Sequence, residues 1–459
     1  MVIQAKQFVK ERTGLEEIDF TDHRRAYSEM LSTIHTHRLV GVDYVLGKIF
    51  DQIGFGQITD PLFKDLVLYR LVYPKSKLKT KEYLYRYQQK NYSEDEIYRY
   101  MDKLHDSRKE LVQHISYQHT LKLLGGSLQA VFYDVTTIYF EIEREDELRK
   151  TGFSKEGKHQ HPQIVLGLLV SKDAYPLAYD LFEGNKYEGD TFLPILESFK
   201  QKYAFNKLTV VADAGLLSKA NVEELIEKGY DFILGARIKN EKQTIKDQIT
   251  QLKLKHGESQ VISSSGHRLI INYSEERARK DRYNRERGLK RLEKKLKAGK
   301  LTKSSINSKG YNKFLKMNGE VTLALDEDKI KQDEKWDGLK GYLTNSQMDK
   351  ESILENYHHL WQIERAFRVA KTELKIRPIF HYKRERIEAH ICLNFVAYKV
   401  YKELERQLKE KQAGLSAEKA IEIIQTIYEV GAITPQNEIV TQTIITTEEQ
   451  RKIQILFGF

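Results

Sequence analysis

Apolar and polar residues follow three successive patterns along this chain. Residues 1–125 show helical periodicity. The segments 127–142, 163–171 and 175–182 are runs rich in apolar, β-branched and aromatic residues, which predict three strands of an antiparallel meander. After them the pattern predicts helix, strand, helix and strand up to residue 237. The order β-β-β-α-β-α-β indicates an α/β protein with a mixed sheet and helices on its faces.

The regular alternation stops after Arg237 and resumes only near residue 353. We interpret the residues between them as an insertion into the mixed α/β domain, because they combine strand-like pieces with one basic segment. The predicted parts are 1–125, a helical N-terminal domain; 126–237, the first part of the core; 238–350, the insertion; 351–412, the C-terminal part of the core; and 413–459, a C-terminal helical region.

One long helix is predicted over 353–375, where apolar residues recur at the spacing of a helix with one buried face. It should end before Arg377–Pro378, because the residue that precedes a proline avoids the helical conformation. Glu364 lies mid-helix, and a carboxylate beside cations and an aromatic ring suits an acidic site that also holds phosphates. A solvated charged face is the alternative. The residues that share its face, four or seven positions away, are Tyr357, Leu360, Arg368 and Lys371.

Composition places the chain among globular proteins with a sizeable core. It has 459 residues, of which 40% are hydrophobic and 31% charged. No apolar run reaches eighteen residues, so we expect no membrane span, and the N-terminus lacks the apolar core of a signal peptide. The single cysteine, Cys392, excludes an internal disulfide framework. The cytoplasm is therefore the expected compartment.

Positive charge is concentrated in one segment. The whole chain carries a net charge of +10, whereas Glu275–Lys316 alone holds sixteen Lys and Arg against five Asp and Glu, a net of +11. Such a segment indicates a polyphosphate partner, most often nucleic acid, and a solvated helical arm is the alternative. The N-terminal region also interleaves basic residues with tyrosines, a pattern that fits either phosphate contacts or tyrosines packed between helices.

Two aspartates occupy positions where a partner for Glu364 would be expected. Asp134 lies inside the first strand, and Asp213 directly follows the fourth, at an end of the sheet where ligands gather. Taken singly, Asp134 could face solvent and Asp213 could cap a helix. Together the three carboxylates would repel one another unless cations neutralise them. Two hard divalent ions, Mg²⁺ or Mn²⁺, about 4 Å apart would do so and would support phosphoryl transfer.

The segments YDVTTIYFE, VVADAGLLS and RPIFHYKRERIEAHICLNFVAY, with the Y-x6-E-x6-K spacing of Tyr357, Glu364 and Lys371, resemble DDE transposases of the IS4-like group. The closest resemblance is to the IS1634-type branch, and it covers about residues 60–400. It implies an RNase H-like catalytic core that is interrupted by an insertion before the glutamate.

The resemblance further implies the transposase of a bacterial insertion sequence, which binds terminal inverted repeats and moves them by cut-and-paste transposition. Asp134, Asp213 and Glu364 would hold the metal pair, and Tyr357 and Lys371 would contact DNA phosphates near the scissile end. The expected assembly is a homodimer on the element's two DNA ends, in the nucleoid of a bacterial cytoplasm. Residues 1–125 would contribute to binding of the ends.

The resemblance also implies an aromatic residue in the insertion that stacks on a flipped base. Trp336, in the KWDG turn, is the candidate, and a small insertion core is the alternative for it. One departure from the family motif is Leu360, which stands where an arginine is usual. Arg368 and Arg365 are the candidate replacements.

Three other interpretations remain open at this stage. The chain could be a metal-dependent nuclease on the same core that transfers no strand, or a non-catalytic DNA-binding relic of a transposase. His159 and His161 have the spacing of a metal-ligand pair. No phosphate-binding GxxxxGK[ST] loop is present, which agrees with a reaction that needs no ATP.

Overall fold

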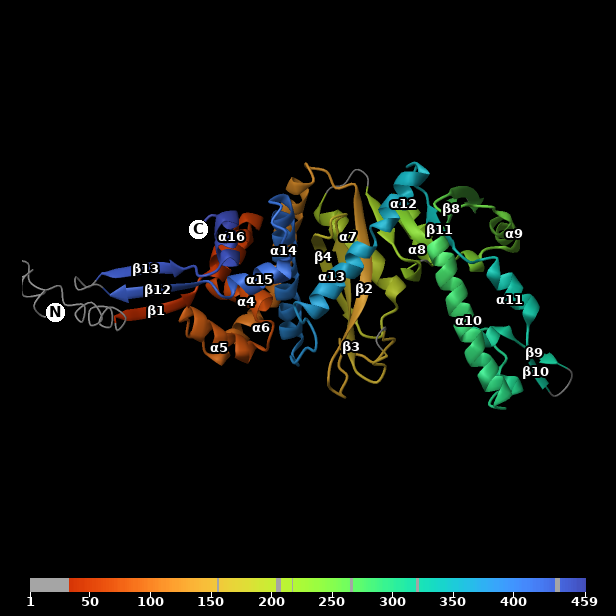
Figure 1. Cartoon of the computed structure of the whole chain (residues 1–459), viewed down its shortest axis with the longest axis horizontal. Helices are drawn as coiled ribbons and strands as arrows, with labels where there is room; N and C mark the ends of the chain where they lie inside the picture. The colour runs from red at the N-terminus through yellow and green to blue at the C-terminus, as the bar shows by residue number, and fades with distance from the viewer. Residues whose placement is uncertain are drawn as a thin grey trace, which may run out of the picture. The chain divides into compact units, whose positions relative to one another are not determined.

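The computed structural model describes residues 33–154, 157–203, 208–216, 218–264, 267–318, 322–433 and 438–459. The chain divides into two compact units, which we describe separately (Figure 1). The central unit comprises 123–138 and 143–365. The terminal unit comprises 1–122, 139–142 and 366–459.

An eight-stranded sheet organises the central unit, in the order β4-β3-β2-β5-β6-β11-β8-β7. Strands β3 and β4 are antiparallel, whereas β2, β5 and β6 are parallel to one another. The first five strands in this order, with helices between them, form the RNase H-like core, so the predicted α/β fold class is confirmed. Their bounds are β2 Ala130–Tyr139, β3 Gln163–Val170, β4 Pro176–Glu183, β5 Thr209–Ala212 and β6 Asp231–Ala236.

The core strands are apolar because both faces of the sheet are covered. All eight residues of β3 (QIVLGLLV) are buried, as are the four of β5 (TVVA). Helix α7, Phe192–Lys202, packs against β3 and β4, and helix α8, Lys219–Glu227, packs against β6. Helix α8 begins at Ser218, whose hydroxyl accepts a hydrogen bond from Asn221 N at 3.1 Å. These two helices cover parts of both the antiparallel and the parallel strands of the core.

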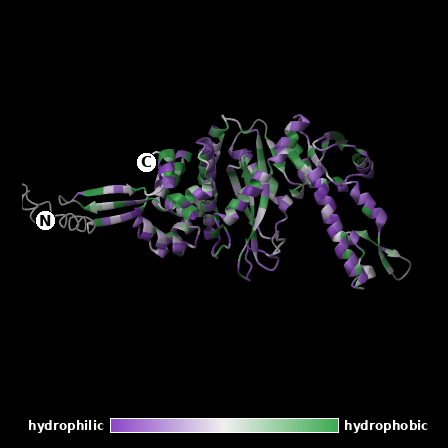
Figure 2. Cartoon of the chain, viewed as in Figure 1, coloured by the Kyte–Doolittle hydropathy of each residue, from purple (hydrophilic) through white to green (hydrophobic). Residues whose placement is uncertain are grey.

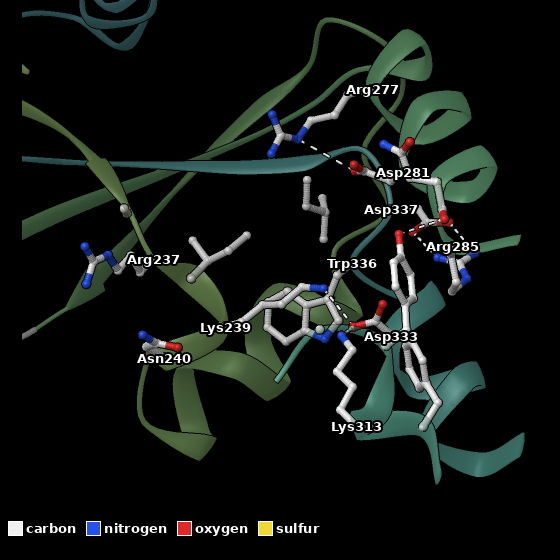
Figure 3. Close-up of a pocket in the computed structure, with 17 residues that line it drawn as sticks. Arg237, Lys239, Asn240, Arg277, Asp281, Arg285, Lys313, Asp333, Trp336 and Asp337 are labelled. Carbon is white, nitrogen blue, oxygen red and sulfur yellow. Dashed lines mark hydrogen bonds and ion pairs between the residues drawn. The ribbon is translucent and has the colours of Figure 1, made fainter. Parts of the chain in front are cut away.

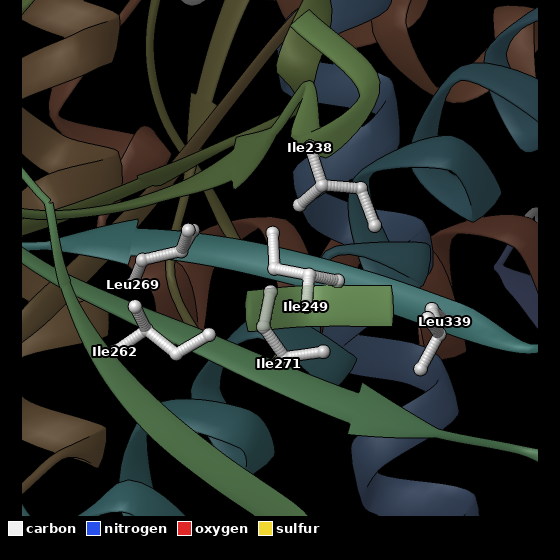
Figure 4. Packing of buried hydrophobic residues seen from close by; sticks show 6 residues of the cluster. All are labelled: Ile238, Ile249, Ile262, Leu269, Ile271 and Leu339. Atoms are coloured by element: carbon white, nitrogen blue, oxygen red, sulfur yellow. The ribbon is translucent and has the colours of Figure 1, made fainter. Parts of the chain in front are cut away.

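The insertion continues this sheet. Strand β11, Leu339–Thr344, pairs antiparallel with β6 on one side and with β8, His267–Tyr273, on the other. Strand β7, Ser259–Ser264, forms the outer edge, and helix α9, Gln243–Gln251, packs over the added strands. Figure 4 shows the apolar cluster that joins them. Its buried members are Ile238, Ile249, Ile262, Leu269, Ile271 and Leu339.

Helix α10, Glu275–Lys297, carries most of the predicted basic segment. Ser274 is the N-cap of this helix, and its hydroxyl accepts a hydrogen bond from Arg277 N at 3.3 Å. The helix is largely hydrophilic, as Figure 2 shows. Only a narrow stripe is buried, where the Tyr311 ring packs so closely on Gly288 that a Cβ there would lie 2.2 Å from the ring. The rest of the inserted region comprises β9 Leu315–Asn318, β10 Thr322–Leu325 and helix α11 Glu327–Glu334.

The helix predicted over 353–375 is two helices. Helix α12 spans Lys350–His358 and helix α13 spans Trp361–Thr372. Between them Leu360 N donates to Tyr357 O at 3.0 Å and Ile363 N to Leu360 O at 3.2 Å, so the backbone tightens into three-residue turns. The prediction of one helix was wrong because the apolar period continues across this break.

The terminal unit combines helices with a small sheet in the order β1-β12-β13. Strand β1, Ile34–Leu39, occupies the end of a segment whose periodicity suggested helix, and residues 1–32 lie outside the described residues. Strands β12, Tyr428–Ile433, and β13, Ile439–Ile444, form a hairpin in the C-terminal region that we expected to be helical. Both segments form strands because β1 pairs with β12, which lies far away in the sequence. Leu39 lies opposite Tyr428 in this pair.

The helices of the terminal unit pack around α14, Arg384–Glu410, which contacts α3, α4 and α15. Cys392 is buried on α14. In the described part of the chain, no helix is long and apolar enough to cross a membrane. The remaining helices are α3 Lys48–Ile53, α4 Pro61–Val72, α5 Lys77–Gln88, α6 Glu94–Leu123, α15 Ala417–Ile424 and α16 Glu448–Phe457.

One buried ion pair ties α10 to the sheet. Arg285 is only 6% exposed, and its guanidinium donates two hydrogen bonds to the Asp337 carboxylate, at 2.5 and 2.7 Å. These bonds raise the pKa of Arg285 above its usual value. Asp337 lies two residues before β11, so the pair joins the basic helix to a strand of the sheet.

This geometry predicts that Arg285→Ala destabilises the insertion by about 3 kcal/mol, because a nearly buried carboxylate loses its partner. Arg287→Ala, an exposed arginine on the same helix, should cost less than about 0.5 kcal/mol. Urea unfolding followed by Trp336 fluorescence, in a Trp361→Phe background, measures both. Equal midpoints for the two variants would show that the buried pair does not hold the helix.

Candidate active site

The parallel pairing of β2 with β5 brings two of the predicted carboxylates together. Tyr133 of β2 lies opposite Ala212 of β5 in the register. The next residue of each chain segment, Asp134 and Asp213, therefore lies at the same level of the sheet. Neighbouring strands are about 4.8 Å apart, and side chains at one level of a parallel pair point to the same face. Asp134 is half-buried within β2, whereas Asp213 is exposed just beyond the end of β5.

A cavity of about 740 Å³ opens at this end of β5. Helix α12 packs against β5 and β6 and forms one wall, and the start of α13 continues it. The insertion strands β8 and β11 form another wall through Asn272, Lys340 and Tyr342. The predicted site residues in its lining are Asp213, Tyr357 and Glu364, and Leu360, at the position where the family usually has an arginine, also lines it.

Tyr357 is directly bonded to one of the carboxylates. Its hydroxyl donates a hydrogen bond to Asp213 Oδ1 at 3.0 Å, and its ring meets that of Tyr342 edge-on, with centroids 4.6 Å apart. Burial, together with the negative charge of Asp213, raises the pKa of Tyr357, which keeps the phenol protonated as a donor. Gly235 makes room for this hydroxyl, because a Cβ there would lie 2.5 Å from it.

The other predicted residues of this helix pair are placed as follows. Glu364 lies in the first turn of α13, exposed, and shares the cavity with Asp213. Leu360 is buried at the break between α12 and α13 and brings no charge. Arg368 and Lys371 lie one and two turns beyond Glu364 on α13, in the part of the helix that belongs to the terminal unit, and Arg368 is exposed.

Sequence reasoning missed the contribution of the insertion to this cavity. Lys340 Nζ lies 4.4 Å from the centroid of the Tyr357 ring and 5.4 Å from that of Tyr342. No motif marks Lys340 or Asn272. The only available signal was the strand-like alternation of LKGY, which places Lys340 and Tyr342 on one face of a strand.

Trp336 lies at a second cavity, of about 690 Å³, between the end of β6, α10 and α11 (Figure 3). Lys239 Nζ lies 5.9 Å from the centroid of the indole ring, and Lys239 and Lys313 both pair with Asp333. The half-buried indole also packs against the insertion's apolar cluster. Trp336 thus both supports the insertion core and faces an open cationic cavity.

The donor chemistry of the first cavity fits a hard divalent ion. Carboxylate oxygens are the ligands that such ions prefer. Three carboxylates, Asp213, Glu355 and Glu364, line the cavity, and Asp134 lies on the strand beside that of Asp213. Within the described ranges, no three His, Cys, Asp or Glu side chains are already gathered as a ligand group. His159 Nδ1 accepts a hydrogen bond from Ser154 N at 3.2 Å, which engages one nitrogen of the suggested His159–His161 pair.

Comparison with known families identifies the chain. A family model described as the transposase DDE domain matches residues 125–399, more than half of the 459 residues. The chain belongs to the DDE transposases. It is therefore a DNA-acting enzyme of the nuclease and strand-transferase kind, in a family that uses divalent metal ions. The matched region begins before β2 and ends within α14, so it contains all three predicted carboxylates.

One solved structure similar to this transposase is the cryo-EM structure of the piggyBac transposase synaptic complex with hairpin DNA. The TM-score is 0.41 with 8% sequence identity, over 84% of this chain and 76% of that chain. No similar sequence is found among curated proteins.

The Tyr357–Asp213 hydrogen bond predicts an energetic coupling. In a double-mutant cycle of Tyr357→Phe and Asp213→Ala, we expect a coupling of about 1 kcal/mol, because the bond is charge-assisted but its acceptor is exposed to water. Urea unfolding followed by Trp361 fluorescence, in a Trp336→Phe background, measures it.

The matched control is the cycle of Tyr342→Phe with Asp213→Ala. The Tyr342 hydroxyl donates to Asn272 Oδ1 at 3.3 Å, so its removal should show no coupling to Asp213. A coupling near zero in both cycles would show that the Tyr357–Asp213 bond contributes nothing to stability.

Proposed function

We propose that this DDE transposase mobilises a bacterial insertion sequence of the IS4-like group, in its IS1634-type branch. It binds the terminal inverted repeats of the element and moves them by cut-and-paste transposition. The observation that carries the proposal is the cavity in which Asp213, Glu364 and Tyr357 meet, with Asp134 at the level of Asp213 on the neighbouring strand.

Asp134, Asp213 and Glu364 are the proposed catalytic carboxylates, and they would hold two divalent ions, Mg²⁺ or Mn²⁺. Bound ions of this kind supply Lewis-acid charge and make water a better nucleophile. Tyr357 orients Asp213 through its hydrogen bond, so this carboxylate is held in one position before any ligand arrives. The pair of α12 and α13 holds Tyr357 and Glu364 on opposite sides of the Leu360 break.

The proposed reaction consists of two phosphoryl transfers. Water attacks a phosphodiester at the end of the element, and the bond to the 3′ oxygen breaks to leave a 3′-hydroxyl and a 5′-phosphate. That hydroxyl then attacks a second phosphodiester, in the opposite strand or in the target, and one phosphodiester replaces another. Because the bond energy changes little in the second transfer, no nucleotide hydrolysis is needed.

The proposed DNA contacts lie on three parts of the chain. Arg368 and Lys371 on α13 would contact phosphates near the scissile bond, whereas Tyr357, which the sequence suggested for the same role, donates its hydroxyl hydrogen to Asp213. Trp336 would stack on a displaced base, since its cavity of about 690 Å³ is of a size that holds small organic ligands. Residues 1–125 would bind the ends of the element as an N-terminal domain.

The exposed face of α10 is the proposed track for the DNA backbone. A shallow groove of about 310 Å³ runs along the helix, beside the 61% exposed ring of Tyr283. The cations along it make no ion pair with any residue that the structure describes, so they are available to phosphates. They are Arg287, Lys290, Arg291 and Lys294.

Both ends of the element must be held together during transposition. We therefore propose a homodimer on two DNA ends, acting on the DNA of a bacterial nucleoid. The proposed division of labour follows the predicted parts of the chain. Residues 126–237 and 351–412 would provide the carboxylates, residues 238–350 the basic insertion, and residues 413–459 a C-terminal region.

The first test is cleavage of a labelled terminal-repeat duplex, with Mg²⁺ or Mn²⁺ and with EDTA. Asp134→Ala, Asp213→Ala and Glu364→Ala should each abolish metal-dependent nicking at the element boundary, because each removes a negative ligand, and each should still bind the ends. Glu373→Ala, an exposed glutamate just after α13, is the control. Full cleavage by any of the three would remove that residue from the site.

A strand-transfer assay with pre-cleaved ends separates a transposase from a nuclease that only cuts. Joined products in the presence of metal support the proposal. Cleavage without joining would assign a nuclease, and binding without cleavage under every metal condition would assign a DNA-binding relic.

The α10 track predicts a change in salt dependence. Arg287→Ala, Lys290→Ala and Arg291→Ala should each reduce the slope of log K against log salt by about 1, because each loses one phosphate contact. The loss of affinity should be equal for terminal-repeat duplexes and for duplexes of unrelated sequence. Lys253→Ala, an exposed lysine outside α10, should leave the slope unchanged. An unchanged slope in all three α10 variants would contradict the track.

A further inference from the structure

We propose that Lys340, supplied by the insertion, is a catalytic residue that contacts the scissile phosphate during DNA cleavage. This inference rests on the proposed function and assigns a further residue to the same site. The carboxylate motif does not include Lys340, which lies 24 positions before Glu364 on a strand of the inserted region.

The register of the sheet fixes where Lys340 lies. On β11, Lys340 is opposite Asn272 of β8, and Tyr342, two residues on, points to the same face. The Tyr342 hydroxyl donates to Asn272 Oδ1 at 3.3 Å, which links the two strands at this point. All three side chains line the cavity that also contains Asp213 and Glu364. The insertion therefore builds one wall of the active site.

Two aromatic rings hold the ammonium group of Lys340 in this wall. Its Nζ lies 4.4 Å from the centroid of Tyr357 and 5.4 Å from that of Tyr342, both within the range of a cation–π contact. Tyr357 is itself bonded to Asp213. The cation is thus positioned by the same side chain that positions one of the proposed metal ligands.

Within the described ranges, the ammonium group of Lys340 contacts aromatic rings but no anion. Lys340 makes no ion pair or side-chain hydrogen bond with the residues that the structure describes. Arg277, another cation of the insertion, differs in this respect, because its Nε pairs with Asp281 Oδ2 at 3.7 Å. Lys340 therefore faces the cavity with all three N–H donors available.

Lys340 lines the same cavity as Asp213 and Glu364, and both carboxylates affect its pKa. Burial lowers the pKa of Lys340, Arg277 lowers it further, and the negative charges of Asp213 and Glu364 act in the opposite direction. The two carboxylates thus attract the ammonium group without touching it. An anion that enters the cavity would accept hydrogen bonds from the Lys340 ammonium group.

A phosphodiester is the anion that the proposed reaction brings there. Carboxylates in the cavity repel its negative charge, and the attack of water adds charge to the phosphate oxygens. A cation fixed in place beforehand stabilises that added charge without reorganisation, an effect worth about 10² to 10³ in rate for a single donor. Leu360 lines the same cavity and has no charge with which to do this.

The test compares wild type with Lys340→Met, which keeps the length of the side chain and removes the charge. Single-turnover cleavage at saturating metal should fall about 100-fold. Binding of the same duplex in EDTA should change less than about threefold, because one phosphate contact contributes little to total affinity. Lys340→Arg should retain part of the rate. Lys253→Met, an exposed lysine of the inserted region, should cleave as wild type does.

A second readout separates direct contact from a structural role. Substituting sulfur for a non-bridging oxygen of the scissile phosphate should slow wild type, in at least one stereoisomer, more than it slows Lys340→Met. Such non-additivity arises only if the lysine and that oxygen interact. If Lys340→Met does not fold, as judged by its circular dichroism, Lys340→Arg takes its place in the same cycle.

The outcomes distinguish this inference from the proposed function. No cleavage by wild type would overturn the proposed function itself. Cleavage by wild type, with Lys340→Met within threefold of it or with fully additive sulfur effects, would overturn the role of Lys340 alone. A tighter affinity for metal with an unchanged rate at saturating metal would show that Lys340 only balances the carboxylates, which also contradicts the inference.

Discussion

The parallel pairing of β2 with β5 is the contact on which the rest of the site depends. It sets Tyr133 opposite Ala212 and so places Asp134 and Asp213 at one level of the sheet. A slip of one residue would turn every side chain of a strand to the other face and separate the two carboxylates. The buried, apolar β5 and the fully buried β3 make such a slip costly, since both faces of these strands are covered. The packing of the core strands therefore fixes Asp134 and Asp213 relative to each other.

The insertion extends this constraint. Its strand β11 pairs with β6 and β8, so the same sheet runs from the core into the insertion. The apolar cluster around Ile271 holds α9 against the added strands, and the Arg285–Asp337 pair fixes α10 to the chain just before β11. A basic helix with a narrow buried stripe needs such anchoring, because its own apolar surface is small. One element thereby presents a row of exposed cations, while the strands beside it line the cavity that contains Asp213.

Gathering carboxylates in one cavity costs free energy in the absence of a ligand. The structure offsets part of this cost through neutral and cationic neighbours. The protonated Tyr357 donates to Asp213, and Lys340 lies over two rings within electrostatic reach of Asp213 and Glu364. The same arrangement leaves Asp213 and Glu364 exposed to the cavity. The cavity is thus lined by groups that stabilise Asp213 and Glu364 and leave both carboxylates exposed.

The sequence by itself determined the order of strands and helices in the core, the separation of the basic segment and the identity of the family, because periodicity, composition and local motifs depend on near neighbours. It also singled out Asp134, Asp213 and Glu364, whose meeting as one metal site stays a prediction. Only the tertiary structure decided the break at Leu360, the pairing of β1 with β12 and the position of Lys340 beside the Tyr357 ring. Each of these depends on packing or on pairing between residues far apart in the chain, and no local pattern carries that information.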